Sequence, residues 1–440
     1  MNIPKVIKLN PPQLLVVVFC VSISVGTLLL KLPIAANGSI GWIDALFIAT
    51  SAMTVTGLAV VDIGTTFTVF GQFIIALLVQ LGGLGIMSFA VLIYIVLGRR
   101  IGIKERLLMQ HALNQTSVGG IIKLVKYLFL FYFSIEFFAM MILSIRWVPE
   151  LGLWKGLFYS GFHAISAFNN AGFSLFSDGL IGYRADPLIN LTISILFIIG
   201  GIGFTVLVDI WSKNSWKRLS LHTKLMLWGS LILNAAAMLF IFAAEYTNPL
   251  TLGTLPLGEK LWASYFQAVS PRTAGFNTLD IASMDEATLF FIIVLMFIGA
   301  GSASTGGGIK LTTALVILLA TLTFLRGKNE ISILRRSIHS SIVMKALAIS
   351  MVSIVFVIFA LLILNLTEAQ SFMSILFEVV SAFGTVGLSM GITGSLTAVG
   401  KILIIFIMFL GKVGPLTLLF TLAKPAKEKY SYPKEDILTG

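Results

Sequence analysis

Four short segments of the chain resemble one another, and this repetition limits the possible folds more than any other feature of the sequence. Each segment begins with Phe, has Ser four residues later and then reaches Gly. The segments are FIATSAMTVTGLAV (47–60), FHAISAFNNAGFSL (162–175), FQAVSPRTAGFNTL (266–279) and FEVVSAFGTVGLSM (377–390). The intervals between their glycines are 115, 103 and 112 residues, so the chain consists of four related units.

Long apolar runs flank every repeat and identify lipid as the solvent of this chain. Hydrophobic residues make up 57% of the sequence and charged residues only 11%, compared with about 25% charged residues in soluble domains. An apolar run precedes each repeat, at about 14–36, 121–145, 223–243 and 342–366. A second run with clustered glycine follows each repeat, at 81–87, 199–205, 298–304 and 410–416. Each unit therefore predicts two membrane-spanning helices with a short segment between them.

The middle segments of the units are too short to cross a membrane. They comprise 11 or 12 residues each, at 42–52, 157–168, 260–270 and 372–383. A helix of that length spans about 16–18 Å, whereas the hydrocarbon core is about 30 Å thick, so each segment must turn back. We therefore expect an all-α polytopic membrane protein with eight spanning helices, four re-entrant pore helices and four parallel repeats arranged with pseudo-fourfold symmetry around one pore.

The charged connections indicate the topology. The predicted units are 1–97, 98–215, 216–326 and 327–424, followed by a tail at 425–440. Of the 30 Lys and Arg residues, 21 lie in the head, in the tail from Lys424 and in the connections 98–126, 211–224 and 324–345. A basic excess marks the cytoplasmic side, so we expect a multi-pass protein of the cell membrane with both termini in the cytoplasm. The net charge of +11 is then a topology signal, and we expect no nucleic-acid partner.

The repeated glycines point to chemistry of the backbone. The C-terminal end of a helix carries a partial negative charge, and carbonyl groups can replace the hydration shell of a cation. Carbonyls that face one axis in succession need backbone angles that glycine adopts most readily. We therefore predict a pore for a monovalent cation, with a filter made of Val55, Thr56, Gly57, Asn170, Ala171, Gly172, Thr273, Ala274, Gly275, Thr385, Val386 and Gly387. The alternative is that these glycines only let helices pack closely.

A glycine-rich stretch interrupts the long apolar run that follows the third repeat. Its sequence, GAGSASTGGGIK (299–310), is a poor helix former, so we predict a broken helix with a loop below the third filter segment. A charge near mid-membrane is costly, so we expect Lys412 to bind carbonyls of this loop. The predicted gate consists of Gly299, Gly301, Ser302, Ser304, Thr305, Gly306, Gly307, Gly308, Lys310 and Lys412. Alternatively, Lys412 only pins two helices together, or Lys310 supplies the same charge.

Other conspicuous residues are expected to have structural roles. Glu136 should form a buried hydrogen bond to a neighbouring helix, and His163 should be a packed polar residue. Close helix packing is the favoured role of Gly82, Gly83, Gly85, Gly200, Gly201 and Gly203. The repeats share no catalytic side chain, so we predict that the chain is not an enzyme and holds no organic cofactor. An alternating-access transporter is the alternative function, although such folds typically have inverted repeats.

The repeats resemble the Trk/Ktr/HKT superfamily of K⁺ transporters over nearly the whole chain. TVTGLAVVD (54–62), HAISAFNNAGFSL (163–175), QAVSPRTAGFN (267–277) and SAFGTVGL (381–388) look like the bacterial Ktr membrane subunit. The resemblance implies K⁺ as the transported ion, because Gly57 matches K⁺-preferring members, whereas serine there is associated with Na⁺ preference. Loop 299–310 matches the intramembrane gate of the family.

The resemblance also implies partners. Such subunits are usually homodimers in which each protomer has its own pore, and a cytoplasmic ring of nucleotide-binding regulatory subunits docks beneath them. Na⁺ often stimulates uptake. The basic connections and the tail from Lys424 to Gly440 are the expected docking surface, and membrane lipid surrounds the spans. Relatives commonly have Arg at the position of Lys412, and Lys keeps the charge but lacks the planar fork of donors, so we expect a closed gate that is held less firmly.

Overall fold

The computed structural model describes residues 11–84, 121–213, 215–302, 304–328 and 330–414. The regular structure of this part is helical, apart from a small hairpin of β1 (Ser332–Ile333) and β2 (Arg336–Ser337). Gly85, the predicted boundary at 97/98, most of the connection 98–126 and the tail from Lys424 lie outside the described residues.

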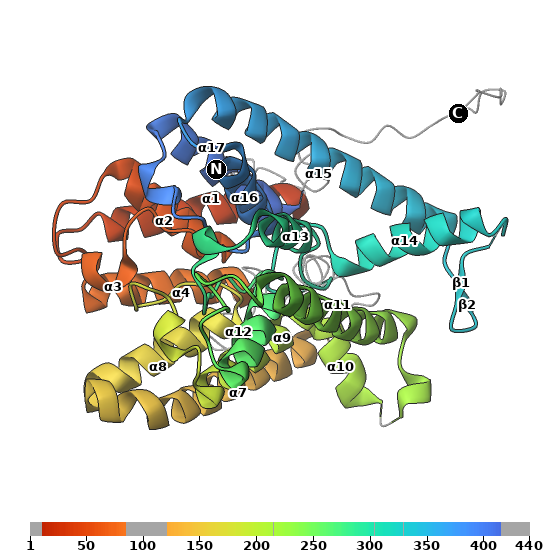
Figure 1. The fold of residues 1–440 in the computed structure, drawn as a ribbon, viewed down its shortest axis with the longest axis horizontal. Helices are drawn as coiled ribbons and strands as arrows, with labels where there is room; N and C mark the ends of the chain where they lie inside the picture. The colour runs from red at the N-terminus through yellow and green to blue at the C-terminus, as the bar shows by residue number, and fades with distance from the viewer. Residues whose placement is uncertain (1–10, 85–120, 214, 303, 329, 415–440) are drawn as a thin grey trace, which may run out of the picture.

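The helices follow the repeats unit by unit (Figure 1). The first unit contains α1 (Pro11–Leu30), α2 (Trp42–Thr54), α3 (Ile63–Thr66) and α4 (Val69–Leu84). The second contains α7 (Ile121–Leu151), α8 (Leu153–Phe168), α9 (Pro187–Ile202) and α10 (Phe204–Ser212). The third contains α11 (Leu221–Glu245), α12 (Leu257–Val269), α13 (Glu286–Phe297) and α14 (Leu311–Leu325), and the fourth α15 (Ser340–Thr367), α16 (Phe372–Gly384) and α17 (Ala398–Val413). The connections contain the short 3₁₀ helices η1 (Ile181–Tyr183), η2 (Trp216–Arg218), η3 (Ile281–Ser283) and η4 (Thr393–Ser395).

Side-chain caps explain where several helices begin. Asp186 accepts hydrogen bonds from two backbone N–H groups at the start of α9, and Pro187 occupies the first helical position, where its missing N–H costs nothing. Ser371 and Thr397 cap α16 and α17 in the same way. These polar residues stand directly before apolar runs, so they set the points at which the apolar helices start.

Three described helical segments are long and apolar enough to cross a membrane: Phe129–Leu151 within α7, Leu221–Glu245 and Ser340–Thr367. Counting α9 and α10 together adds a fourth span, although the two helices meet at an angle of 90°. Apolar side chains point outward from the long helices, for example Phe138 with 66% and Leu239 with 70% of its surface exposed. An outward apolar surface of this kind suits contact with lipid. The chain is therefore an all-helical membrane protein.

The helices of the repeats, α2, α8, α12 and α16, are longer than the sequence predicts. We refer to them as the short helices. α2, α12 and α16 have 13 residues each, and α8 has 16 because it begins at Leu153, directly after Gly152. Gly152 has a φ of 83°, which separates α8 from α7. Even α8 extends over only about 24 Å, which is less than a hydrocarbon core of about 30 Å.

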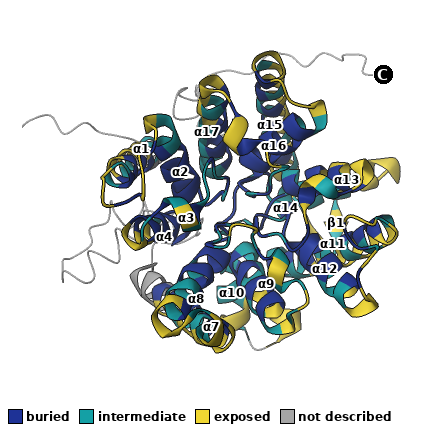
Figure 2. Cartoon of the chain, turned by 60° about the vertical axis from the view of Figure 1, so that its left-hand side comes forward, coloured by how far each residue is buried: buried dark blue, intermediate teal, exposed yellow. Residues whose placement is uncertain are grey.

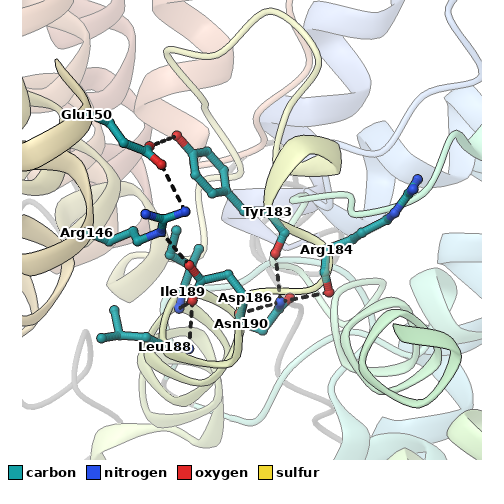
Figure 3. Close-up of polar contacts among 8 residues, drawn as sticks. All are labelled: Arg146, Glu150, Tyr183, Arg184, Asp186, Leu188, Ile189 and Asn190. Carbon is teal, nitrogen blue, oxygen red and sulfur yellow. Dashed lines mark hydrogen bonds and ion pairs between the residues drawn. The ribbon is translucent and has the colours of Figure 1, made fainter. Parts of the chain in front are cut away.

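In every unit the segment with the short helix starts and ends on the same side. Hydrogen bonds join the end of the first long helix to the start of the second: Thr68 N to Ala35 O at 3.0 Å, Arg146 Nε to Asp186 Oδ2 at 2.8 Å, Asp285 N to Glu245 Oε1 at 3.0 Å and Thr397 N to Glu368 Oε2 at 3.0 Å. Figure 3 shows this junction in the second unit, where Arg146 also pairs with Glu150 at 3.0 Å. Because both ends meet, the chain between them must turn back.

The helix after the second repeat is broken at Gly203, a role that the sequence did not predict for this glycine. Gly203 ends α9 and begins α10 with a φ of 96° and a ψ of 141°. A residue with a Cβ rarely adopts these angles, so this glycine stops the helix. Gly414 has nearly the same angles, a φ of 88° and a ψ of 134°, at the end of α17.

The packing role predicted for other glycines of these clusters is confirmed. A Cβ on Gly82 would lie 2.0 Å from the carbonyl oxygen of Met53, and a Cβ on Gly200 would lie 2.0 Å from that of Phe168. These oxygens belong to the last turns of α2 and α8. The glycines therefore let the second long helix of a unit approach the end of its short helix.

The most buried part of the molecule is its centre. In Figure 2 the short helices and their neighbours surround a central group of loops that are coloured as buried. The central loops follow α2, α8, α12 and α16 and contain the predicted filter residues, whose side chains have almost no exposed surface. A core made of chain turns rather than of packed helices is unusual in a membrane protein, because irregular backbone there needs partners other than lipid.

Candidate functional site

The four predicted filter segments close into a ring. A Cβ added to each repeated glycine would collide with the next segment: Gly57 with Ala171 O at 2.2 Å, Gly172 with Gly275 Cα at 2.8 Å, Gly275 with Val386 O at 2.2 Å and Gly387 with Thr56 O at 2.2 Å. Each unit thus touches the next one through a glycine, and the fourth unit touches the first. Only glycine permits so close an approach of two backbones.

All four segments have the same backbone conformation. The first residue of each has a positive φ, namely 56° at Val55, 58° at Asn170, 71° at Thr273 and 49° at Thr385. The third residue is the repeated glycine, with a φ of 91° at Gly57, 69° at Gly172, 75° at Gly275 and 94° at Gly387. The middle residue does not share this feature. A repeated departure from ordinary angles at one place in four units indicates a function rather than a local accident.

The side chains of these segments are buried. The middle residues Thr56, Ala171, Ala274 and Val386 have no exposed side-chain surface. The polar groups left to line the ring are therefore backbone carbonyls, which the clashes above place beside the neighbouring glycines. A ring of carbonyl oxygens is a binding site for a partly dehydrated cation.

A serine near the C-terminal end of each short helix, or directly after it, anchors the filter segment from behind. Ser51 and Ser381 accept a hydrogen bond from the backbone N–H of Gly57 and Gly387, at 3.1 and 3.2 Å. Ser166 instead donates to the carbonyl of Phe173 at 2.8 Å, and Ser270 donates to that of Phe276. The four serines mark the repeats in the sequence, but their role as anchors was not predicted. Two of them accept a hydrogen bond and two donate one, so the shared residue type did not indicate one shared contact.

The electrostatics of the ring favour a cation. No more than three residues separate the end of each short helix from its filter segment, so the partial negative ends of these helices converge there. None of these helices has Lys or Arg in its last turn to offset that charge.

A cavity opens on one side of the ring, which we call the vestibule side. It has a volume of about 370 Å³ and is lined by all four repeated glycines and by Asp62. Burial disfavours the charge of Asp62, but hydrogen bonds from Ser177, Thr65 and Gly64 outweigh it and lower the pKa of this carboxyl. Asp62 is therefore a fixed negative charge at the entrance to the ring, where it attracts cations.

The predicted gate loop lies against the opposite side of the ring. The chain between α13 and α14 is not helical, and it contacts the first residue of three filter segments. Thr305 donates to Asn170 Oδ1 at 2.8 Å, and the backbone N–H of Gly307 donates to Thr385 Oγ1 at 2.8 Å. A Cβ on Gly306 would lie 2.4 Å from the Oγ1 atom of Thr273.

Two ammonium groups hold this loop. Lys412, from α17, donates to the carbonyl oxygen of Thr305, as the sequence predicts. Lys310 donates to the carbonyl oxygens of Gly306 at 2.5 Å and Gly307 at 3.5 Å. Neither lysine forms an ion pair with a carboxylate of the described chain. Positive charge therefore stands beside the loop side of the ring, where it repels cations.

The other predicted gate residues brace the loop and do not contact the filter. Ser302 shares a hydrogen bond with Thr312 at 2.8 Å, and Ser304 donates to the carbonyl of Gly301 at 2.6 Å. Backbone bonds tie Gly299 to Ile309, Gly301 to Gly201 and Gly308 to Gly411. The loop is thus connected to α9 and α17 as well as to its own flanking helices.

The expected buried hydrogen bond of Glu136 is confirmed. Its carboxyl accepts from Gln80 of α4 at 3.1 Å and from Asn169 at 3.1 Å. Asn169 also donates to Gln80 at 2.8 Å, which closes a three-residue network next to Asn170. The network links two units behind the second filter segment. Among the described residues no group of His, Cys, Asp and Glu could hold a metal.

Comparison with known proteins agrees with this geometry. Residues 7–431 match the TrkH family, described as a cation transport protein. The "Ktr system potassium uptake protein B" of Bacillus subtilis is 58% identical over 99% of this chain and 98% of its own length. The protein of the same name from Vibrio alginolyticus is 42% identical, over 98% and 96%. The "Potassium/sodium uptake protein NtpJ" of Enterococcus hirae is 37% identical, over 98% of both chains.

A solved structure shares the fold. The crystal structure of the potassium transporter TrkH from Vibrio parahaemolyticus superposes with a TM-score of 0.76, covering 96% of this chain and 87% of the other at 21% identity. The family match spans nearly the whole chain, and it contains all four repeats of the ring. The chain belongs to the TrkH family of cation transport proteins.

Proposed function

We propose that this chain is the ion-conducting membrane subunit of a K⁺ uptake system of the Ktr type. K⁺ would enter from the vestibule side, lose part of its hydration shell in the ring of filter carbonyls and pass the loop into the cytoplasm. The names of the relatives, which describe potassium uptake, support K⁺ as the ion. The word sodium in the name of one relative supports a role of Na⁺ in uptake.

One observation carries the proposal: four glycines with positive φ touch one another in a closed ring at the ends of four short helices. The ring offers backbone oxygen atoms, and its fixed charges favour a cation on the vestibule side. The filter would consist of residues 55–57, 170–172, 273–275 and 385–387. An enzyme needs side chains in defined roles, whereas here the side chains differ between units and the backbone is what they share.

The proposed topology has eight crossings and four re-entrant segments, as the sequence predicts. The second long helices, α4, α9, α13 and α17, have only 12 to 16 residues in the described structure. In this proposal the chain beyond each of them completes the crossing. The basic connections then lie in the cytoplasm together with both termini.

Loop 299–310, Lys310 and Lys412 would form the gate. The loop lies between the ring and the proposed cytoplasmic side, and both ammonium groups bind its carbonyls. Opening would require Lys412 to release Thr305, so that the loop can leave the path of the ion.

We also propose that the chain works as a homodimer on a cytoplasmic ring of nucleotide-binding regulatory subunits. The hairpin β1–β2 extends from the helical body beyond α14 (Figure 1). Leu334 and Arg335 form its exposed turn, and the exposed Arg336 begins β2. An exposed apolar residue followed by two arginines suits a partner with an acidic rim around an apolar pocket.

Gly57→Ser tests the proposed filter. The new Cβ would lie 2.2 Å from the carbonyl oxygen of Ala171, so the ring must distort. Purified protein in lipid vesicles should carry K⁺ and Rb⁺, and the variant should lose K⁺ over Na⁺ selectivity by about tenfold, equivalent to about 1.4 kcal/mol.

Gly152→Ser is the matched control. Gly152 also has a positive φ, of 83°, but a Cβ there would meet no atom within 4 Å. This variant strains the backbone without touching the ring, so its selectivity should equal that of the wild type. An unchanged K⁺/Na⁺ ratio in Gly57→Ser, with normal protein yield, would overturn the filter assignment.

A further inference from the structure

The second residue of each repeated segment occupies the same place in its short helix but differs in chemistry. These residues are Ile48, His163, Gln267 and Glu378, and each precedes the anchoring serine by three residues. All four are completely buried. Because each short helix lies beside the chain that leaves its filter segment, a polar side chain here can bind that chain.

In the fourth unit, Glu378 binds the chain beyond the filter with both carboxyl oxygens. Oε2 accepts from the hydroxyl of Ser389 at 2.7 Å, and Oε1 accepts from that of Thr393 at 2.6 Å. Ser389 follows the filter glycine Gly387 by two residues and in turn accepts the backbone N–H of Gly391 at 3.0 Å. One side chain of α16 therefore fixes the whole turn that leaves the fourth filter segment.

In the second unit, His163 makes the equivalent contact. Its Nδ1 lies 2.8 Å from the carbonyl oxygen of Tyr159, which can only accept, so Nδ1 carries the proton and Nε2 is an acceptor. Nε2 accepts from the hydroxyl of Ser174 at 3.2 Å and from the backbone N–H of Leu175 at 3.4 Å. Ser174 follows Gly172 by two residues, as Ser389 follows Gly387.

The remaining two units lack this contact. Ile48 is apolar, and both polar atoms of the Gln267 amide are buried without a hydrogen-bond partner among the described residues. In the third unit the chain beyond the filter is held from outside instead, because Leu180 of the second unit donates its N–H to the carbonyl of Asn277 at 3.0 Å. Around the ring the units follow one another in the order first, second, third and fourth. The second and fourth units, which have the contact, therefore face each other across the axis.

We propose that Glu378 and His163 are positioning residues that clamp two opposite filter segments and thereby set ion selectivity. This inference rests on the proposed filter. Selectivity among cations requires that the carbonyl oxygens resist collapse onto a smaller ion, and support from behind holds such a site in place. Ser174 lines the cavity on the vestibule side, and Ser389 lines a second cavity of about 360 Å³ that shares Gly275 and Gly387 with it, so the clamps act where an ion would enter.

The test compares variants of Glu378 in vesicles that contain the purified full-length chain. Glu378→Leu removes both acceptors and should lower the K⁺/Na⁺ permeability ratio by about tenfold, as expected when buried hydroxyls lose charged acceptors. Ser389→Ala removes one of the two bonds on the cavity side, where folding is less at risk, and should lower the ratio by a smaller factor. Glu378→Gln keeps an acceptor for Thr393 and should restore most of the selectivity.

Gln267→Leu is the control in the same position of another unit. The Gln267 amide has no hydrogen-bond partner in the part of the chain that the structure describes, so this variant should keep the wild-type ratio. His163→Leu should reproduce the effect of Glu378→Leu, and His163→Gln, which retains an acceptor, should lessen it.

Equal losses of K⁺/Na⁺ selectivity in Gln267→Leu and Glu378→Leu would overturn the proposal in favour of simple core packing. Equal losses in Glu378→Gln and Glu378→Leu with no effect of Ser389→Ala would overturn it in favour of a role of charge alone.

Gly57→Ser, measured in the same vesicles, separates this inference from the proposed function. If that variant loses selectivity and the clamp variants do not, only the clamp is wrong. If Gly57→Ser keeps selectivity, the filter assignment fails and the clamp fails with it.

Discussion

Three of the four residues that begin the filter segments combine a branched Cβ with a positive φ. Val55, Thr273 and Thr385 are each in a region where such residues cost about 1–3 kcal/mol. The hydroxyls of the two threonines recover part of that energy, because Thr385 accepts from Gly307 at 2.8 Å and Thr273 accepts from Asn170 at 3.3 Å. The strained backbone is thus held by contacts with the loop and with the neighbouring filter segment.

Gly387 and Gly391 form a matched pair that separates strain from crowding. Their φ angles are 94° and 88°, but a Cβ on Gly387 would lie 2.2 Å from Thr56 O, whereas one on Gly391 would meet nothing within 4 Å. We expect Gly391→Ala to lose about 1 kcal/mol of stability and to transport with normal selectivity. Gly387→Ala should abolish selective transport. Rb⁺ uptake into vesicles, with and without Na⁺, measures the selectivity of both variants. Equal selectivity in the two variants would contradict the ring geometry.

At the scale of whole elements, a loop between two helix segments distinguishes the third unit from the others. α13 ends at Phe297 and α14 begins at Leu311, and the chain between them lies beneath the ring. The second unit has a different break, at Gly203, which redirects the chain by 90° without forming a loop. Both breaks free backbone groups, and the two breaks partly satisfy each other, because the N–H of Gly301 donates to the carbonyl oxygen of Gly201 at 2.8 Å.

Lys412→Met tests the hold of α17 on the loop. Methionine keeps the length of the side chain but cannot bind the Thr305 carbonyl. A hydrogen bond from a charged donor contributes about 1.5–3 kcal/mol, so we expect the open fraction, and with it K⁺ flux, to rise by about tenfold or more. Lys401→Met is the control, because Lys401 lies in the same helix and pairs with Asp44 at 2.8 Å away from the loop. Unchanged or lower flux at normal yield would rule out Lys412 as part of the closed gate.

Some of these features could be predicted from the sequence and others could not, for physical reasons. The filter glycines were predictable because only glycine fits where two backbones touch, and Lys412 because a buried charge demands a partner. The break at Gly203 was missed, since a glycine that stops a helix and one that packs look alike in a run such as IGGIG. The clamp roles of His163 and Glu378 were missed because the four units use different residue types at that position.

At the scale of the whole molecule, the four units repeat one backbone conformation at the ring but differ in what else they contribute. All four units contribute equivalent carbonyls to the ring, but only the third provides the loop, and the fourth provides Lys412. The hairpin β1–β2 lies between the third and fourth units, and α14 connects it to the loop. A partner that binds the hairpin could therefore pull on α14 and shift the equilibrium of the loop.

The docking proposal predicts that Arg335→Glu with Arg336→Glu weakens binding of the purified regulatory ring. Two charge reversals on an exposed contact should reduce affinity by about tenfold at physiological salt and by less at high salt. Lys155→Glu, at the start of α8 on the vestibule side, should bind normally. Titration with labelled ring subunits measures this, and equal affinities of all three proteins would argue against the hairpin as a docking site.

Anomalous diffraction from crystals of the full-length protein grown in Rb⁺ tests the central claim most directly. A peak should lie on the axis of the ring, enclosed by the carbonyl oxygens of Thr56, Ala171, Ala274 and Val386, and it should weaken when K⁺ competes but not when Na⁺ does. If protein that carries Rb⁺ into vesicles shows its Rb⁺ peaks outside this ring and none within it, the ion is selected elsewhere and the account is wrong.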